Sequence, residues 1–290
     1  MRVAGFLFIR NAIKYDYPVN EAIRSLLPVC DEVYINAGNS EDATDEMISD
    51  IDSPKIHIHH SVWDDSLREG GRVLAVETDK AFDLVPENVD WCIYLQADEV
   101  LHEEDYTVLR ENMEKYKDDP QVEGFLFKYR HFYGSYDYVG DSRRWYSHEI
   151  RIIRNDKQIR SYRDAQGFRK NGRKLQVKLI NAHIYHYGWV RHPSRQLQKH
   201  LEFEKLYNHD KWAREAAEQQ KEDFDYTGID SLQKFGGTHP GVMQDLIRRK
   251  NWDFHIDTRV KKFTFKGWIL YLIEKYTGKR LFDYRNYKVI

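Results

Sequence analysis

Short apolar runs alternate with helix-like stretches through the first hundred residues of the chain. The apolar, strand-forming runs cover residues 3–9, 32–36, 56–60 and 91–95, and the helix-like stretches cover residues 18–27, 42–51 and 70–82. This alternation is typical of βαβ units and predicts an α/β fold with a largely parallel sheet. Ligands of such sheets bind beyond the carboxyl ends of the strands, so the loops that follow these four runs should converge on one crevice.

The second half of the chain is less regular. It predicts a helix at 103–117 and strands at 124–129 and 149–154, separated by an aromatic, glycine-rich loop at 131–147. Loops of that length inside a compact domain are usually functional. From residue 194 the pattern becomes helical and strongly charged, at 194–207 and 211–222. We therefore predict an α/β domain at 1–190 and a mainly helical part at 191–290 that packs on it.

Two carboxylates follow the buried run WCIYL directly. In WCIYLQADEVLHEED the apolar run leads into Asp98 and Glu99. Carboxylates at the end of a buried strand are costly unless a group binds them, and a Mn²⁺ or Mg²⁺ ion that shares its shell with phosphates and waters needs only one or two protein carboxylates. The alternative is that one of them only caps the helix that begins near residue 103.

A second polar segment, VYINAGNSEDATDEMI, joins a strand to the start of a helix. Its backbone N–H groups and the short side chains of Asn36, Ser40 and Asp42 suit a nucleotide. Simple helix capping by Ser40 or Asp42 would give the same pattern.

Together these segments resemble the family-2 glycosyltransferases of the GT-A fold. The opening FLFIRNAIKYDYPVNEAIRSLLPVCDEVYINAGNSEDATDEMI resembles the family's first strand, its "LLP…CDEV" phrase and its nucleotide loop, and WCIYLQADEVL resembles its metal motif. The resemblance covers the first half of the chain and implies a mixed, mostly parallel sheet flanked by helices, with a helical C-terminal extension. It also implies a hexosyltransferase-like enzyme, of the kind that builds cell-envelope polysaccharides, which uses a nucleotide-diphosphate sugar and Mn²⁺ or Mg²⁺.

The resemblance also assigns donor-binding residues. Contacts with the nucleotide and diphosphate are expected from Arg10, Asn11, Asn36, Ser40, Asp42, Arg72 and Gln96. The guanidinium fork of Arg72 suits a diphosphate, although a solvated helix position would explain this residue equally well. Two departures matter: Gln96 replaces the first acidic residue of the metal motif, and Ala37 stands where many members carry the aspartate that reads uracil.

The resemblance places the remaining working residues in the second half. The general base of an inverting transferase is expected after the strand IRIIR, which favours Asp164, with Asp141 and Glu149 as rivals. In HIYHYGWVRHP, His186 is expected to bind the metal or the diphosphate ahead of His183, and a structural role for it stays open. The phrase FGGTHPGVM, with His239, is either a loop that closes over the acceptor or a simple turn.

Composition narrows the location and the partners. Hydrophobic residues make up 41% and aromatic residues 14%, so the chain can form a core, and its two cysteines suggest neither a disulfide framework nor a zinc site. The expectation is a cytoplasmic protein that is soluble or peripheral at the membrane, since the longest apolar runs are too short to span a bilayer. From Arg248 to Ile290, twelve Lys/Arg stand against four Asp/Glu, a balance of +8 in a chain of net charge −2. This basic segment predicts contact with an anionic membrane or acceptor, or else a solvated helix face.

The leading interpretation is therefore an inverting, metal-dependent transfer of a sugar to a carbohydrate or lipid-linked hydroxyl acceptor. A nucleotidyltransferase is the alternative in chemistry, although the glycine-rich phosphate loop expected after its first strand is absent from FLFIRNAIKYD. A non-catalytic carbohydrate-binding relative is kept open by Gln96 and Ala37. A nucleic-acid role is disfavoured, because the basic charge is confined to one segment and no recognition motif accompanies it.

Overall fold

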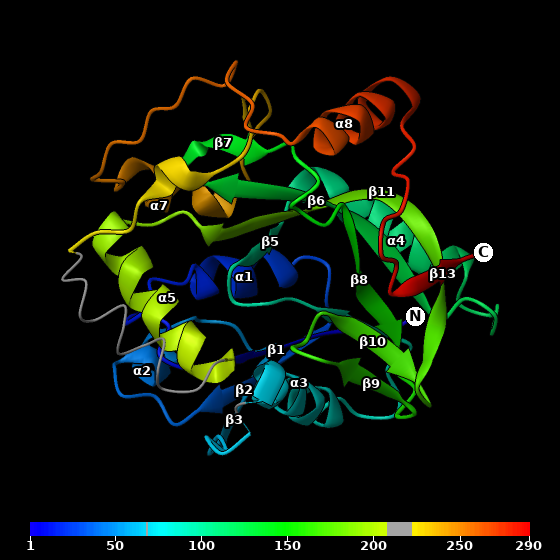
Figure 1. Cartoon of the computed structure of the whole chain (residues 1–290). Helices are drawn as coiled ribbons and strands as arrows, with labels where there is room; N and C mark the ends of the chain where they lie inside the picture. The colour runs from blue at the N-terminus through cyan, green and yellow to red at the C-terminus, as the bar shows by residue number, and fades with distance from the viewer. Residues whose placement is uncertain (68, 208–221) are drawn as a thin grey trace.

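The computed structural model describes residues 1–67, 69–207 and 222–290, which form a mixed sheet flanked by helices (Figure 1). The strands are β1 (Val3–Ile9), β2 (Glu32–Gly38), β3 (Ile56–Ser61), β4 (Trp91–Tyr94), β5 (Glu99–Leu101), β6 (Gly124–Tyr133), β7 (Ser135–Gly140), β8 (His148–Arg154), β9 (Ile159–Tyr162), β10 (Gly167–Lys170), β11 (Arg173–Trp189), β12 (Leu232–Lys234) and β13 (Tyr287–Val289). The α-helices are α1 (Val19–Leu26), α2 (Thr44–Ser49), α3 (Arg72–Asp83), α4 (Tyr106–Lys115), α5 (Pro193–Tyr207), α7 (Gln244–Arg248) and α8 (Phe265–Thr277). The predicted α/β class with helices on a mixed sheet is confirmed.

The first four strands form the parallel half of the sheet, in the order β3-β2-β1-β4. Each crossover in this half contains a helix, as the alternating sequence pattern predicted. Because the strands run in the same direction, their carboxyl ends lie along one edge, and the loops that follow them meet there.

Strand β1 is covered on both faces and so separates two cores. Val3, Leu7 and Ile9 pack with residues of α1, α2 and α4, whereas Ala4 and Phe6 pack with residues of α3 and β10. Alternate residues of a strand point to opposite faces, so a continuous apolar run is what a strand buried on both sides requires.

The second half of the sheet adds antiparallel strands and one long strand. β8 pairs antiparallel with both β4 and β6, and β6 in turn pairs parallel with β11. The sequence did not indicate β11, because its exposed end is rich in charged residues such as Arg173 and Lys174. The carboxyl end of β11 carries His186 to the same edge as the loop after β4.

The loop predicted at 131–147 is in part a hairpin, which corrects the prediction. β6 continues to Tyr133, and the chain turns at Gly134 into β7. Gly134 has φ 71°, and a Cβ there would lie 2.6 Å from the ring of Phe254, so only glycine fits both the backbone and the packing. The irregular part is therefore limited to residues 141–147.

The C-terminal part begins with α5, close to the predicted helix at 194–207. The second predicted helix, at 211–222, falls almost entirely outside the described residues. Among the residues that are described, no helix combines the length and the apolar character needed to cross a bilayer. The boundary near residue 190 remains a prediction.

Candidate functional site

Two pockets lie at the carboxyl edge of the sheet and share one wall. The smaller has a volume of about 360 Å³ and the larger about 1230 Å³. Four residues line both pockets: Leu74, Gln96, Asp98 and Lys199. A ligand that occupies both pockets must therefore pass Asp98 and Lys199.

The smaller pocket is built by loops from four parallel strands. Its lining includes Arg10 and Asn11 after β1, Glu41 after β2, Trp63 after β3, and Ala97 after β4. The convergence of these loops on one crevice is thereby confirmed. It follows from the common direction of the strands.

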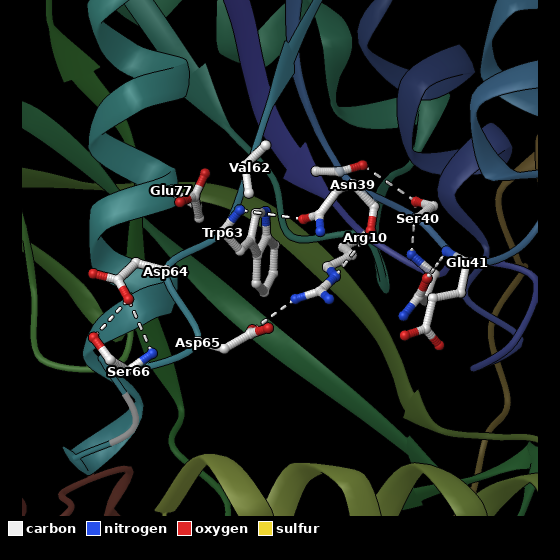
Figure 2. A network of polar contacts seen from close by, with 12 residues as sticks. Arg10, Asn39, Ser40, Glu41, Val62, Trp63, Asp64, Asp65, Ser66 and Glu77 are labelled. Carbon is white, nitrogen blue, oxygen red and sulfur yellow. Dashed lines mark hydrogen bonds and ion pairs between the residues drawn. The ribbon is translucent and has the colours of Figure 1, made fainter.

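An arginine and a tryptophan form one side of this pocket, as Figure 2 shows. Arg10 donates to the Asp65 carboxylate (2.8 Å) and to the Asn39 carbonyl (3.2 Å), and its guanidinium carbon lies 5.5 Å from the ring centroid of Trp63. The backbone N–H of Trp63 donates to Asn39 Oδ1 at 3.2 Å. A Cβ on Gly38 would lie 2.3 Å from Trp63 Nε1, so glycine lets the indole approach the strand end. The result is an aromatic and cationic surface that suits a planar, polar ligand.

Three of the predicted nucleotide-binding residues have scaffold positions instead. Asn36 is fully buried and donates to Glu77 Oε2 at 2.8 Å. Ser40 Oγ accepts from the Asn11 backbone N–H, and Asp42 accepts from the backbone N–H groups of Thr44 and Lys14. The contacts of Ser40 and Asp42 fix the loops after β1 and β2 to each other, and that of Asn36 ties β2 to α3. None of the three side chains lines either pocket.

Asp98 is a buried, ionised carboxylate at the shared wall. It is 8% exposed, and its Oδ2 accepts from Lys199 Nζ at 3.3 Å. Burial alone would raise its pKa, but the cations Lys199 and Arg191 outweigh burial and lower the pKa to about 2. Burial and Arg191 lower the pKa of Lys199 to about 7, whereas Asp98 raises it, so the lysine is the member of the pair that titrates near neutral pH.

A chain of two imidazoles presents a lone pair to Asp98. His131 Nε2 lies 2.8 Å from the Tyr146 carbonyl, and His131 Nδ1 lies 3.0 Å from His186 Nδ1. A carbonyl can only accept, so His131 carries its proton on Nε2; burial keeps its pKa well below the ordinary value, and its Nδ1 accepts from His186. Burial also lowers the pKa of His186, whose Nε2 is then unprotonated and lies 3.8 Å from Asp98 Oδ1.

Glu99, the other carboxylate of the acidic motif, has a structural role. Its oxygens accept from Arg151 Nε at 2.7 Å and Nη2 at 2.8 Å, and both residues are almost completely buried. Tyr129 donates to the same carboxylate at 2.7 Å. This bidentate pair ties the start of β5 to β8 and leaves Glu99 no free oxygen for a ligand in either pocket, which Glu99 does not line.

The larger pocket contains two of the three candidate bases. Asp164 lines it from the turn between β9 and β10, where its neighbours Arg163 (φ 57°) and Ala165 (φ 62°) both adopt left-handed backbone. Glu149 also lines it, but burial raises the pKa of this carboxyl to about 8. Asp141 lines neither pocket and binds Lys261 at 2.7 Å.

Arg72 and Gln96 keep pocket positions, and two other histidines do not. Arg72 lines the larger pocket from the first residue of α3. His183 lies outside both pockets, beside Asp105, and His239 accepts from or donates to Tyr187 OH at 2.9 Å. The structure thus brings His186, rather than His183, to Asp98.

The residues at the wall fit a divalent cation only in part. Asp98 and His186 Nε2 offer one carboxylate and one neutral imidazole, which suit Mn²⁺ or Mg²⁺ when phosphates and waters complete the shell. Within residues 1–67, 69–207 and 222–290 there is no group of three or more His, Cys, Asp or Glu that could hold a metal alone. A metal here would therefore depend on a phosphate-bearing ligand.

Sequence reasoning missed Lys199, Trp63 and His131. Lys199 lies in the charged helix α5, where its sequence neighbours give no sign that this lysine is turned inward. His131 could have been found from its place on β6, directly beside His186 of β11, but only with the register of the two strands in hand.

Comparisons with known proteins give no family assignment. No family model matches the chain, and no curated protein matches it. A solved structure of S. aureus TarS in complex with UDP-GlcNAc is similar at a TM-score of 0.40 and 11% identity, over 71% of this chain and 66% of that one. In another TarS structure (TM-score 0.39, 14% identity), 70% of this chain spans only 39% of the neighbour.

A putative glucose-1-phosphate thymidylyltransferase from Bacillus anthracis, in complex with a sucrose, is similar at a TM-score of 0.34 and 12% identity. The match covers 87% of this chain and 98% of that one. Likenesses at this level do not determine activity, so the function has to be argued from the two pockets and their shared wall.

Proposed function

We propose that the protein transfers a sugar from a nucleotide-diphosphate sugar to a hydroxyl acceptor, with inversion at the anomeric carbon. The observation that carries this proposal is the shared wall: an ionised carboxylate, an ammonium group and an imidazole lone pair lie between a small aromatic pocket and a large polar one. A nucleotide-diphosphate sugar has the matching order, with a planar base and ribose, two phosphates, and a sugar.

The smaller pocket suits the nucleoside. The Trp63 indole and the Arg10 guanidinium form an aromatic and cationic side on which a base can stack. Ala37 is fully buried and lines neither pocket, so the aspartate that reads uracil in many family members has no counterpart there. The proposal therefore leaves the identity of the base to the contacts of Arg10, Asn11 and Trp63.

The shared wall suits the diphosphate. Lys199 supplies a cation at the wall, and Asp98 holds that cation in place through the 3.3 Å contact. Asp98 and His186 Nε2 are the residues that would hold Mn²⁺ or Mg²⁺, which would neutralise charge on the diphosphate as it leaves. The low pKa of Asp98 keeps its carboxylate ionised at neutral pH, which both the contact with Lys199 and the binding of a metal ion require.

The larger pocket suits the sugar and the acceptor. As the new glycosidic bond forms, the acceptor hydroxyl must lose its proton to a base on the side opposite the diphosphate. Asp164 lines this pocket and is assigned that role. Glu149 would hold its proton at neutral pH, because burial raises its pKa to about 8, so it suits a hydrogen bond to a sugar hydroxyl better.

The test is product analysis with a panel of nucleotide sugars. The purified full chain is incubated with UDP-, GDP-, dTDP- and CDP-sugars, with and without Mn²⁺, and released products are separated by chromatography. We expect a nucleoside diphosphate and free sugar from one class of donor, with Mn²⁺ increasing the rate. Release of pyrophosphate from a nucleoside triphosphate and a sugar phosphate would instead indicate a nucleotidyltransferase. Binding of free sugars without any donor binding would indicate a carbohydrate-binding protein.

A further inference from the structure

One face of helix α8 is apolar and exposed. Five of its residues form what we call the apolar stripe: Phe265 (83% exposed), Trp268 (38%), Ile269 (45%), Leu272 (41%) and Tyr276 (78%). Trp268 and Ile269 are neighbours and the other steps are three or four residues, so at about 100° of rotation per residue all five lie within one face of an α-helix. Large apolar side chains gathered on one exposed face mark an interaction surface more often than isolated ones do.

The opposite face of α8 holds the helix on the protein. Glu274 accepts from Arg143 Nη1 at 2.8 Å, and Tyr271 donates to Asp141 Oδ2 at 3.4 Å. Both ends of the helix are capped. The Thr264 side chain accepts from the backbone N–H of Gly267, and Gly278 ends the helix in the left-handed conformation. These contacts fix the direction in which the stripe points, which is away from the protein.

Lysines flank the stripe on both sides. With about 100° of rotation per residue, Lys266 lies roughly 100° to one side of the centre of the stripe and Lys275 roughly 80° to the other. Both lysines are exposed. Helices that lie in the headgroup region of a bilayer typically have an apolar face with aromatic residues and lysines along its edges. The aliphatic part of such a lysine covers apolar surface while its ammonium group stays in the polar region.

The segment beyond the helix has the same character. Phe282 is 91% exposed and adopts φ 58°, and Tyr284 is 54% exposed. The twelve Lys/Arg and four Asp/Glu from Arg248 to Ile290 give this part of the chain a charge of +8. That charge complements an anionic surface. It also opposes the pairing of two copies of this face, because two positively charged segments repel each other.

We propose that α8 docks the protein on an anionic membrane surface, with the apolar stripe among the lipid headgroups and Lys266 and Lys275 at the phosphates. The helix would lie in the plane of the membrane and not cross it. Arg280, three residues after the end of α8, donates to the carbonyls of Arg143 and Trp145 and so fixes the chain beyond the helix to the protein. This proposal does not depend on which reaction the large pocket performs.

Vesicle sedimentation tests the proposal. The full chain is mixed with vesicles of phosphatidylcholine alone, or with about 30% phosphatidylglycerol, at ionic strengths of about 0.05 and 0.5 M. We expect binding to the anionic vesicles only, weakened at the higher salt. Binding to neither vesicle, or equally to both, would overturn the proposal.

Two variants distinguish membrane binding through the apolar stripe from nonspecific binding through any exposed apolar residue. Leu272→Gln should lower the bound fraction about fivefold or more, and Leu179→Gln, which changes a leucine of similar exposure (48%) on β11, should not. Lys266→Gln with Lys275→Gln should reduce binding and its salt dependence together. Unchanged binding by Leu272→Gln would contradict the docking role of the stripe.

Two further measurements keep the result independent of folding and of activity. Far-UV circular dichroism and donor hydrolysis in solution should be unchanged in Leu272→Gln, because the stripe touches neither pocket. Sedimentation equilibrium should show the same mass for the wild type and Leu272→Gln. A dimer of the wild type that dissociates in this variant would identify the stripe as a self-association surface and overturn membrane docking.

Discussion

Lys199 Nζ lies 3.3 Å from Asp98 Oδ2 and so joins helix α5 to the loop after β4. The contact sets an ammonium group at the point where the two pockets meet, beside the position proposed for the diphosphate. Lys199→Gln should therefore weaken donor binding about ten- to a hundredfold, because a charge-assisted hydrogen bond to phosphate is lost. Isothermal titration with nucleoside diphosphate measures the loss. Arg195→Gln, an exposed position on the same helix, is the control and should bind normally.

Asp98→Asn removes the charge that balances Lys199 and the carboxylate that would hold a metal. Turnover should fall about 10²–10³-fold or more, and the enhancement of donor binding by Mn²⁺ should disappear, while circular dichroism stays unchanged. The buried lysine then loses the Asp98 charge that raises its pKa, so its pKa should fall further. Near-normal, metal-stimulated activity in this variant would show that the diphosphate site lies elsewhere.

Asp164→Asn keeps the shape of the side chain and removes its ability to accept a proton. Transfer should fall about 10²-fold or more, with donor affinity little changed, because the donor is held at the wall and in the smaller pocket. The matched comparisons are Glu149→Gln in the same pocket and Asp141→Asn outside it. If Asp164→Asn transfers sugar at the wild-type rate while Glu149→Gln is inactive, the base is Glu149.

Glu149 should make stability decrease as pH rises. Burial raises its pKa in the folded protein to about 8, above its ordinary value of 4.5, so between these values the folded state keeps a proton that the unfolded state has released. This group alone lowers the free energy of unfolding by up to about 1.4 kcal/mol per pH unit in that window. Urea unfolding at several pH values should show a smaller decline in Glu149→Gln, and identical slopes would refute the raised pKa.

Glu99→Gln should test the structural role of the buried pair with Arg151. Removing one charge leaves the other buried without its partner, which typically costs about 3–5 kcal/mol. The midpoint of urea unfolding reports the loss. Asp257→Asn, which breaks the exposed contact with Arg259, should leave the midpoint nearly unchanged. Equal effects of the two changes would mean that Glu99 is not a structural anchor.

The parallel half of the fold could be predicted because its strands are short apolar or alternating runs and a helix lies between each strand and the next. In the second half, the strands predicted at 124–129 and 149–154 are confirmed as β6 and β8, but β11 was not predicted, because Arg173, Lys174 and Lys178 interrupt its apolar pattern. In the hairpin of β6 and β7, the alternating aromatic residues around Gly134 indicate strands. The segment was predicted as a loop because of its length and its glycines.

The site shows the same limit. Asp98 was predictable because a carboxylate that directly follows a buried strand needs a partner, and its placement at the shared wall agrees with that reasoning. The role of Asp98 as a metal ligand remains a prediction, as does the role of Asp164 as the general base. Lys199 and His131 were not predictable, since each matters only through a contact with a residue far away in the chain.

The group that orders the two imidazoles is the main-chain carbonyl of Tyr146, and not its side chain. No substitution at position 146 can delete a carbonyl, while the Tyr146 side chain itself lines the larger pocket. During divergence, this position could change the fit of the acceptor and still preserve the lone pair at His186. Substrate range and phosphate chemistry could then evolve independently at a single residue.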